Sequence, residues 1–250
     1  MNKMENIVSF LGIKVDLEDK FSLTEKVIRA SVNDGISLIP HHNLHSLYLF
    51  HKYEKFREFY KLADITHIDG MPLILLAKLS GKKARSVNRI TYLDWVDILF
   101  NRLNDEKKKV FYLGSKPGVA AKAADILRDK YPDITFKVAN GYFDTDGDDN
   151  REIIQKLNNF NPDILMVGMG MPRQEYWVMD NIEKLKCRVI LTSGAFFDYI
   201  AGEIKTPPRV MGRIGLEWLY RLVTEPKRLW RRYLLEPAEL TYLLIKKKLS

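Results

Sequence analysis

Cysteine is nearly absent from this chain of 250 residues, because Cys187 is the only one. A disulfide framework is therefore excluded, and a reducing compartment fits the composition. No run of 18 apolar residues occurs, which argues against a membrane-spanning helix. The first residues carry charges among their apolar positions and lack the apolar stretch of a signal peptide. We therefore expect a protein that is made and kept on the cytoplasmic side.

Internal repeats and low-complexity segments are also missing. Hydrophobic residues make up 46% of the chain and charged residues 29%, which is typical of a globular protein with a full hydrophobic core. The net charge of +8 is distributed unevenly, since residues 201–250 hold eleven Lys or Arg against five Glu, or +6. The first 200 residues are nearly neutral.

The hydrophobic pattern alternates between strand type and helix type. Strands are expected at residues 7–10, 13–15, 36–39, 65–68, 110–113, 134–138, 164–167 and 189–192. Helices are expected at residues 22–33, 44–62 (in two pieces), 72–79, 91–103, 117–130, 149–160 and 172–182. Ser22 and Glu25 have the spacing of a capping box at the start of the first helix. This alternation predicts an α/β fold, a Rossmann-like and mostly parallel sheet with helices on both faces.

The stretch from Asp163 to Glu175, DILMVGMGMPRQE, combines a buried-strand pattern with a glycine turn and a helix start. Gly168 and Gly170 let the backbone turn tightly, and Pro172 suits the first turn of a helix. This layout directs backbone N–H groups and the positive end of a helix dipole toward a phosphate. Glycine turns also occur in sheets that bind nothing, so the motif alone leaves a nucleotide site open.

In sheets of this kind ligands lie beyond the carboxyl ends of the strands. That rule selects the loops after Ile39, Ile68, Leu113, Val167 and Thr192. The first loop contains His41 and Asn43, and the second contains Asp69 and Gly70. The others begin at Gly114, Gly168 and Ser193, so that several glycine loops meet at one edge. Together they suit a pyrophosphate better than any one of them does.

Motifs that follow one another along nearly the whole chain resemble the WecG/TagA/CpsF proteins, glycosyltransferase family 26. They are Asn43, IDGMP at 68–72, the Arg89/Thr91/Asp94 cluster, YLGSKPGVA at 112–120, NGYF at 140–143, VGMGMPRQE at 167–175, SGAFFDYIAG at 193–202 and EWLYRLVTEPKRLWRRYL at 217–234. The resemblance implies inverting, metal-independent transfer without a cofactor. The sugar would pass from a UDP-sugar to a polyprenyl-diphosphate-linked saccharide at the inner membrane face, in the synthesis of cell-surface polysaccharide.

The resemblance also implies roles for particular residues. Asp69 matches the family's proposed catalytic aspartate and is the expected base for the acceptor hydroxyl. Arginines are expected on the diphosphate groups, since guanidinium suits phosphate oxygens: Arg89, Arg221, Arg228, Arg231 and Arg232. Further substrate contacts are expected from His41, Asn43, Gly70, Asp94, Gly114, Gly168, Gly170, Pro172, Gln174, Glu175 and Gly194. Gln174 and Glu175 would bind uridine or ribose.

Three positions depart from the family pattern. His41 stands where many members have threonine, and Tyr92 stands where glycine is usual. Thr206, Pro207 and Pro208 replace the usual R-A-P. These departures suggest a different sugar.

Other interpretations of these residues are structural. Asp69 could cap the helix that starts near Pro72, and Gln174 with Glu175 could be a solvated surface pair. The segment FDTDGDDN at 143–150 resembles the start of an EF-hand loop but has Asp149 and Gln155 where that loop needs glycine and glutamate. His41, His42 and His45 have spacing that could ligate zinc but lack further partner motifs. We expect no metal site.

Residues 201–250 are expected to form a basic helical appendage to a core of residues 1–200. Three helices are predicted, at 216–223, 227–235 and 238–249, broken before Pro226 and Pro237. Aromatic and apolar residues among arginines suit a helix that lies in the interface of an anionic membrane. A plain packing helix with a cationic face remains an alternative, as does a tail that stacks on single-stranded nucleic acid, which we disfavour because no RNA-binding signature appears.

Two functional hypotheses follow. The first is a peripheral glycosyltransferase at the cytoplasmic face of the membrane. The second is a membrane-associated sugar-nucleotide binding protein without turnover. The sequence leaves the sugar, the acceptor and the oligomeric state open, although an exposed apolar patch would favour self-association.

Overall fold

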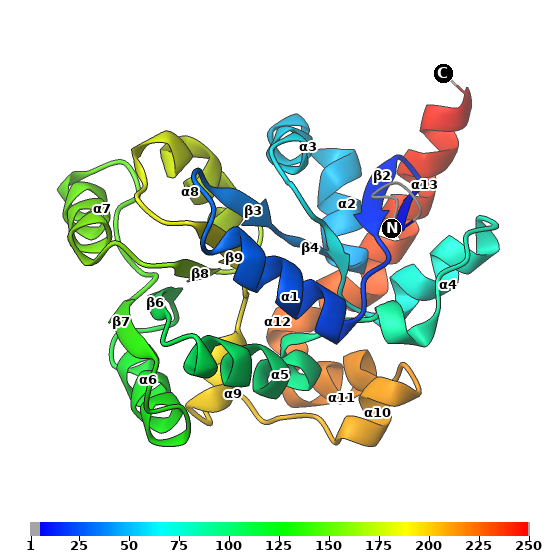
Figure 1. Cartoon of the computed structure of the whole chain (residues 1–250). Coiled ribbons are helices and arrows are strands. Elements are labelled where there is room, and N and C mark those ends of the chain that lie inside the picture. The colour runs from blue at the N-terminus through cyan, green and yellow to red at the C-terminus, as the bar shows by residue number, and fades with distance from the viewer. Residues whose placement is uncertain (1–5, 250) are drawn as a thin grey trace.

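The computed structural model describes residues 6–249 and shows a parallel sheet enclosed by helices (Figure 1). Five strands form this sheet in the order β3 (Ser37–Ile39), β9 (Val189–Thr192), β8 (Ile164–Gly168), β6 (Lys109–Gly114) and β7 (Thr135–Ala139). Every pair of neighbours runs parallel. The predicted α/β class and the Rossmann-like arrangement are confirmed.

Alternate strand residues point to opposite faces of the sheet, as the two-residue period of a strand requires. In β8, Ile164 and Met166 face one core, and Leu165 and Val167 face the other. The first core is covered by α1 (Lys20–Ala30), α5 (Tyr92–Asp105), α6 (Val119–Lys130) and α9 (Phe196–Ile200). The second is covered by α3 (Glu54–Lys61), α7 (Asp148–Phe160) and α8 (Arg173–Asn181), with η2 (Ile182–Lys184) after α8.

A third core lies beside the sheet. It is built from the hairpin β1 (Ile7–Phe10) and β2 (Ile13–Asp16), from α2 (Leu44–Lys52), from α4 (Met71–Leu79) and from the last helix, α13 (Glu236–Leu249). Between this core and the sheet, β4 (His41–His42) pairs with β5 (His67–Ile68) in a separate parallel sheet. The expectation that Ile68 ends a strand of the main sheet is therefore wrong. The chain continues beyond Pro40 into β4, which draws β5 away from the five strands.

Two predicted helix ends also need correction. Asp19, not Ser22, caps α1, and its carboxylate accepts from the backbone N–H groups of Phe21 and Ser22 at 2.9 and 2.8 Å. Pro237 does not break the tail. The chain turns helically from α12 (Pro226–Trp230) through the π-helical η3 (Arg231–Leu235) into α13. The wider π turn stands just before the proline, where an ordinary turn would lose its hydrogen bond and clash.

The tail lies against the rest of the molecule (Figure 1). It begins with α10 (Arg209–Arg213) and α11 (Glu217–Thr224), which precede α12. Leu240 of α13 is 4% exposed and belongs to the third core. His45 of α2 contacts Glu236 at 2.5 Å, and the Tyr48 hydroxyl donates to Glu239. The boundary at residue 200 stays a prediction, but α13 is an integral part of the third core.

Candidate active site

A cavity of about 550 Å³ opens at the carboxyl ends of the parallel strands. Its lining combines the loops after β5, β8 and β9 with the start of α4. The tail covers the opposite side through α10, α11, α12 and η3. Tail residues that line the cavity are Gly212, Gly215, Glu217, Trp218, Arg221, Glu225, Arg228, Arg232 and Tyr233.

Glycines allow the strands to approach closely beneath this cavity. A Cβ on Gly114 would collide with the carbonyl of Gly168, and a Cβ on Gly168 would collide with the Tyr112 hydroxyl. Gly170 and Gly194 have φ angles of 81° and 52°, in the left-handed region that favours glycine. The turn predicted from Gly168 to Gly170 is present, and Pro172 lies directly before α8.

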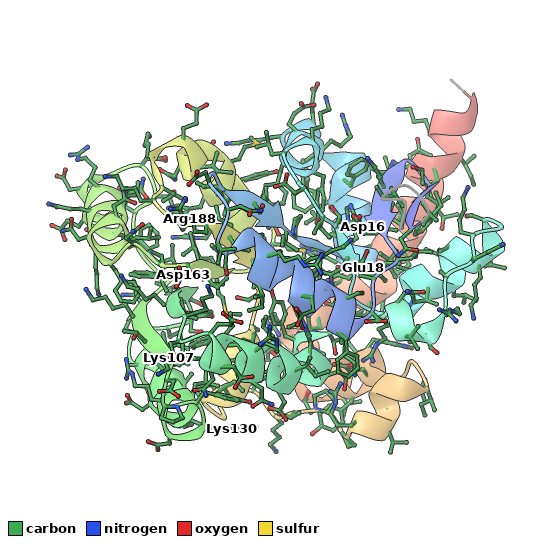
Figure 2. The ribbon with its side chains drawn as sticks, viewed as in Figure 1. Asp16, Glu18, Lys107, Lys130, Asp163 and Arg188 are labelled. Carbon is green, nitrogen blue, oxygen red and sulfur yellow. The ribbon has the colours of Figure 1, made fainter. Side chains whose placement is uncertain are left out.

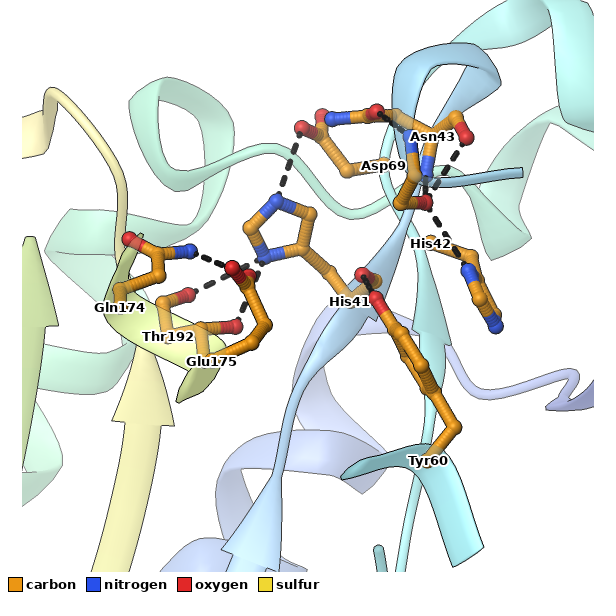
Figure 3. A network of polar contacts seen from close by, with 9 residues as sticks. His41, His42, Asn43, Tyr60, Asp69, Gln174, Glu175 and Thr192 are labelled. Carbon is orange, nitrogen blue, oxygen red and sulfur yellow. Dashed lines mark hydrogen bonds and ion pairs between the residues drawn. The ribbon is translucent and has the colours of Figure 1, made fainter. Parts of the chain in front are cut away.

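Asp69 and His41 both line the cavity, and their side chains point toward each other (Figure 3). The Asp69 side chain is 31% exposed and that of His41 is 6% exposed, with His41 Nε2 3.8 Å from Asp69 Oδ2. His41 Nδ1 lies 3.1 Å from the carbonyl of Thr192. A carbonyl only accepts, so Nδ1 carries the proton and the neutral ring presents the Nε2 lone pair to Asp69. Burial lowers the pKa of His41, although the charge of Asp69 opposes this.

Asp69 is not a helix cap. Gly70 occupies the N-cap position of α4 with φ 116°, and no side chain caps this helix. The structural alternative for Asp69 is therefore wrong. The backbone N–H of Asp69 donates to the carbonyl of His42 at 2.7 Å, and the carboxylate forms no hydrogen bond within residues 6–249. The carboxylate remains available to a ligand.

Gln174 and Glu175 are both fully buried, so a solvated surface pair is also wrong. Gln174 Nε2 donates to Glu175 Oε1 at 2.8 Å, which leaves Gln174 Oε1 and Glu175 Oε2 without a partner in the described part of the chain. Burial raises the pKa of Glu175 to about 7, although the hydrogen bond from Gln174 opposes it. Gln174 lines the cavity, and Glu175 lies behind it. Buried polar atoms without partners are expected where a ligand supplies them.

Two buried hydroxyl groups in the cavity wall are also unpartnered within residues 6–249. These are the hydroxyl groups of Tyr92 and Ser193. Tyr92 stacks on Phe196 with ring centroids 5.3 Å apart, so that its ring is fixed. With Gln174 Oε1 they offer a hydroxyl-bearing ligand both donors and an acceptor.

Arg89 and Asp94 form a brace between the core and the tail. Arg89 is 8% exposed and contacts Asp94 and Glu217 of α11, each at 2.8 Å. Arg209 of α10 also contacts Asp94, at 2.5 Å. Desolvation would raise the pKa of Asp94, but the two arginines lower it. Arg89 lines the cavity and Asp94 does not, and both are already committed to ion pairs.

The tail arginines fall into three kinds. Arg221 and Arg232 line the cavity, and neither has a carboxylate within ion-pair distance in the part of the chain that the structure describes. Arg228 also lines it but pairs with Glu225 at 2.5 Å. Arg231 does not line the cavity, and its guanidinium lies 5.6 Å from the centre of the Trp230 ring. The sequence alone did not distinguish these four residues.

Most predicted site residues meet at this cavity. Those that line it are His41, Asn43, Asp69, Gly70, Arg89, Gly168, Gly170, Gln174, Gly194, Arg221, Arg228 and Arg232. Those that do not are Asp94, Gly114, Pro172, Glu175 and Arg231. Asn43 uses its Oδ1 to cap α2, accepting from Ser46 N at 3.0 Å, so part of its role is structural.

The prediction missed Glu217 and Glu225, which hold Arg89 and Arg228. Both stand four residues from Arg221, and this spacing puts Glu217 and Arg221 on one face of α11, whereas Glu225 follows the last residue of that helix. For Glu217 the spacing was therefore a usable signal. The same rule separates Arg231 from Arg232, because neighbours differ by about 100° around a helix.

The side chains considered as metal ligands are engaged in contacts within the protein. His41, His42 and His45 contact different partners: Thr192, Ser46 at 2.9 Å and Glu236. In the segment 143–150, Asp144 accepts from the backbone of Asp146 at 3.0 Å, as in a turn. Among residues 6–249 no three His, Cys, Asp or Glu side chains are grouped as metal ligands.

Comparison with known proteins gives this site a context. The family model described as "Glycosyl transferase WecG/TagA/CpsF family" matches residues 8–250. A Bacillus spizizenii (strain W23) protein named N-acetylglucosaminyldiphosphoundecaprenol N-acetyl-beta-D-mannosaminyltransferase is 33% identical over 182 residues, which cover 73% of this chain and 68% of that protein. Proteins of the same name from Staphylococcus aureus strains MRSA252 and NCTC 8325 are 30% identical over 144 residues, covering 58% of this chain and 56% of theirs.

Proposed function

The chain belongs to the WecG/TagA/CpsF family of glycosyl transferases, and we propose that it transfers a sugar from a UDP-sugar to a polyprenyl-diphosphate-linked saccharide. The observation that carries this proposal is the pairing of a ligand-accessible carboxylate, Asp69, with two unpaired guanidinium groups in one cavity. The reaction serves the synthesis of a cell-surface polysaccharide and inverts the anomeric carbon.

Asp69 acts as the general base. It takes the proton of the acceptor hydroxyl while that oxygen forms its bond to the anomeric carbon. The bond from this carbon to the phosphate oxygen breaks, and its electron pair leaves with UDP. Attack from the face opposite the leaving group inverts the configuration. The neutral His41 ring lies beside Asp69 and adds no positive charge there that would weaken the carboxylate as a base.

Arg221 and Arg232 neutralise the departing diphosphate. Both line the same cavity as Asp69 and interact electrostatically with it, which supports this role. A charge-assisted contact to phosphate is roughly twice as strong as a neutral one. The turn before α8 adds backbone N–H groups and the positive end of the helix. These groups supply the charge that a metal ion would otherwise provide, so we propose transfer without a metal.

The names of the relatives guide the choice of substrate. They describe transfer of N-acetyl-beta-D-mannosamine to N-acetylglucosaminyldiphosphoundecaprenol. We propose a donor of the N-acetylhexosamine class and an acceptor of the lipid-diphosphate class for this chain. Tyr92 and Ser193 would bind polar groups of the sugar, and Gln174 would bind the nucleoside. His41 and Tyr92 are larger than the family's threonine and glycine, which narrows the cavity and bears on which sugar fits.

The acceptor lipid requires a membrane, and we propose that the tail contacts its cytoplasmic face. Residues 6–249 contain no helix that is both long enough and apolar enough to span a bilayer. Exposed apolar side chains of the tail include Trp218, Leu219, Val223, Trp230 and Leu234. Arg231 and Lys227 lie among them and are exposed. This mixture suits the interface of an anionic membrane.

The test uses Asp69→Asn in the full chain with labelled UDP-sugars and a lipid-diphosphate acceptor. We expect the variant to keep its fold and its UDP affinity while transfer falls by at least about 100-fold, the range for loss of a general base. Transfer is measured as UDP release that requires acceptor. Undiminished transfer would rule out Asp69 as the base. If the wild-type protein binds UDP but forms no UDP from the UDP-sugars when acceptor is present, the result would instead support a binding protein without turnover.

A further inference from the structure

The face of α4 that points away from the third core carries exposed apolar and basic side chains. Leu75 and Leu79, one helical turn apart, are 57% and 76% exposed, and Val87 is 51% exposed. Lys78, Lys83 and Arg85 are exposed among them. We call these six residues, with the partly exposed Lys82, the α4 surface. The opposite side of α4 is buried through Leu73, Ile74 and Ala77.

The charge of this segment is of one sign. Residues 70–93 contain five basic residues and no Asp or Glu. None of the basic side chains of the α4 surface forms an ion pair with a described residue. Exposed lysines elsewhere do pair, such as Lys55 with Asp180 at 2.9 Å and Lys130 with Asp97 at 2.6 Å. The α4 surface therefore offers unneutralised positive charge beside exposed leucines.

The segment is fixed in place. Asn88 is buried and its Nδ2 donates to the carbonyls of Leu17 and Glu18 at 3.0 and 3.1 Å, while its Oδ1 accepts from Arg85 N at 2.8 Å. Asn88 therefore ties the loop after α4 to the chain at Leu17 and Glu18, and the side chains of the α4 surface project from an ordered support.

The start of α4, which precedes the α4 surface, lies at the cavity and beside the tail. Gly70, Met71 and Pro72 at the start of α4 line the cavity. A Cβ on Gly215, between α10 and α11, would lie 3.3 Å from Met71. Figure 1 shows α4 at the edge of the molecule, between α13 and the α10–α11 segment.

We propose that the α4 surface is a second membrane contact, which docks on anionic lipid head groups independently of the tail. Leucines enter the interface while the lysines and Arg85 meet lipid phosphates. Two contacts on either side of the cavity mouth orient it toward the bilayer. Lipid binding by the α4 surface does not depend on the proposed function. Its role in orienting the cavity does rest on that function, because the lipid-linked acceptor lies in the bilayer.

The experiment compares two full-length triple variants by sedimentation with phosphatidylglycerol vesicles and with phosphatidylcholine vesicles. The α4 variant carries Lys78→Glu, Lys83→Glu and Arg85→Glu, which reverse three charges of the α4 surface and lower the net charge of the chain from +8 to +2. The matched variant carries Lys107→Glu, Lys184→Glu and Lys186→Glu, which change the net charge equally but lie near the amino ends of β6 and β9. Figure 2 shows Lys107 and Arg188 in this region, away from α4.

We expect the α4 variant to bind phosphatidylglycerol vesicles at least about tenfold more weakly than the wild type, since each basic residue near the surface contributes on the order of 1 kcal/mol. The matched variant should bind within about threefold of the wild type. Its substituted residues lie away from the α4 surface, so we expect their distance from the docked membrane to exceed the Debye length. Leu75 and Leu79→Ser, which keeps the charge, should also weaken binding.

Equal vesicle binding by the α4 variant and the wild type would overturn the inference. An equal loss of binding in both triple variants would also overturn it, because the loss would then follow from net charge alone.

The variant with Leu75→Ser and Leu79→Ser tests self-association. If its oligomeric state changes while vesicle binding stays intact, the α4 surface is a contact between copies of the chain and not a lipid contact. Transfer to a short-chain soluble acceptor should persist in the α4 variant. If the wild type transfers nothing, the proposed function fails, whereas a binding difference between the variants still supports the lipid contact.

Discussion

His41 contributes to the site through the atom that it presents to Asp69. The hydrogen bond to Thr192 fixes Nδ1 as the donor, so Nε2 faces the carboxylate at 3.8 Å. Its other neighbours are the His67 ring, the Tyr92 ring and the charge of Arg232. A carboxylate beside a neutral ring is a better base than one paired with a cation.

Replacing His41 with Asn should separate these roles. Asn keeps a side-chain N–H for the Thr192 carbonyl but removes the nitrogen near Asp69, so we expect kcat to fall about tenfold with the KM for the donor unchanged. Burial lowers the pKa of His41, so the ring is neutral above that pKa. Protonation at lower pH pairs it with Asp69 and weakens the base.

The pH profile of kcat checks this interpretation. In the wild type the loss of activity toward acid includes protonation of the His41 ring beside Asp69. In the variant this loss should move to lower pH, because the ring that takes up the proton is gone. Superimposable profiles, with kcat reduced or not, would show that His41 has only a packing role.

At the scale of elements, the helices of the tail place its arginines in different positions relative to the cavity. Arg232→Gln should weaken UDP binding at least about tenfold, since it removes an unpaired charge-assisted contact to phosphate. Arg231→Gln in the next position should bind UDP as the wild type does, because Arg231 lies outside the cavity. Titration calorimetry with UDP measures both. Equal losses in the two variants would contradict the assignment.

Most elements were predictable from sequence because their patterns are local. The apolar runs of β6, β8 and β9 and the glycines between β8 and α8 are visible in the chain. The pairing of β4 with β5 was not, since two-residue strands carry no periodicity. The ion pairs of Arg89 and Arg228 were also missed. The pair of Arg89 with Glu217 depends on how the tail lies over the cavity, which is a tertiary property, whereas Arg228 pairs with Glu225 only three residues away.

At the scale of the whole molecule, α13 belongs to the third core, and this changes how the tail can be tested. Deletion from about residue 215 would remove Leu240 from that core, so lost vesicle binding would not isolate a membrane role. Leu240→Ala should lower the free energy of unfolding by about 2–4 kcal/mol, as for other buried leucines. Chemical denaturation measures the change.

Ile245→Ala on the same helix is the matched control, because Ile245 is 55% exposed. It should change the free energy of unfolding by less than about 0.5 kcal/mol. If Leu240→Ala is equally silent, α13 does not stabilise the third core in solution.

The glycines beneath the cavity limit how this enzyme can diversify. Because Gly114 and Gly168 admit no Cβ, these two positions cannot change, and a new sugar preference must come from other parts of the cavity lining. Much of that lining is the tail, which we propose also adheres to lipid. Selection for another substrate and selection for another bilayer composition would thus act on the same few helical turns, and a gain in one would be constrained by the other.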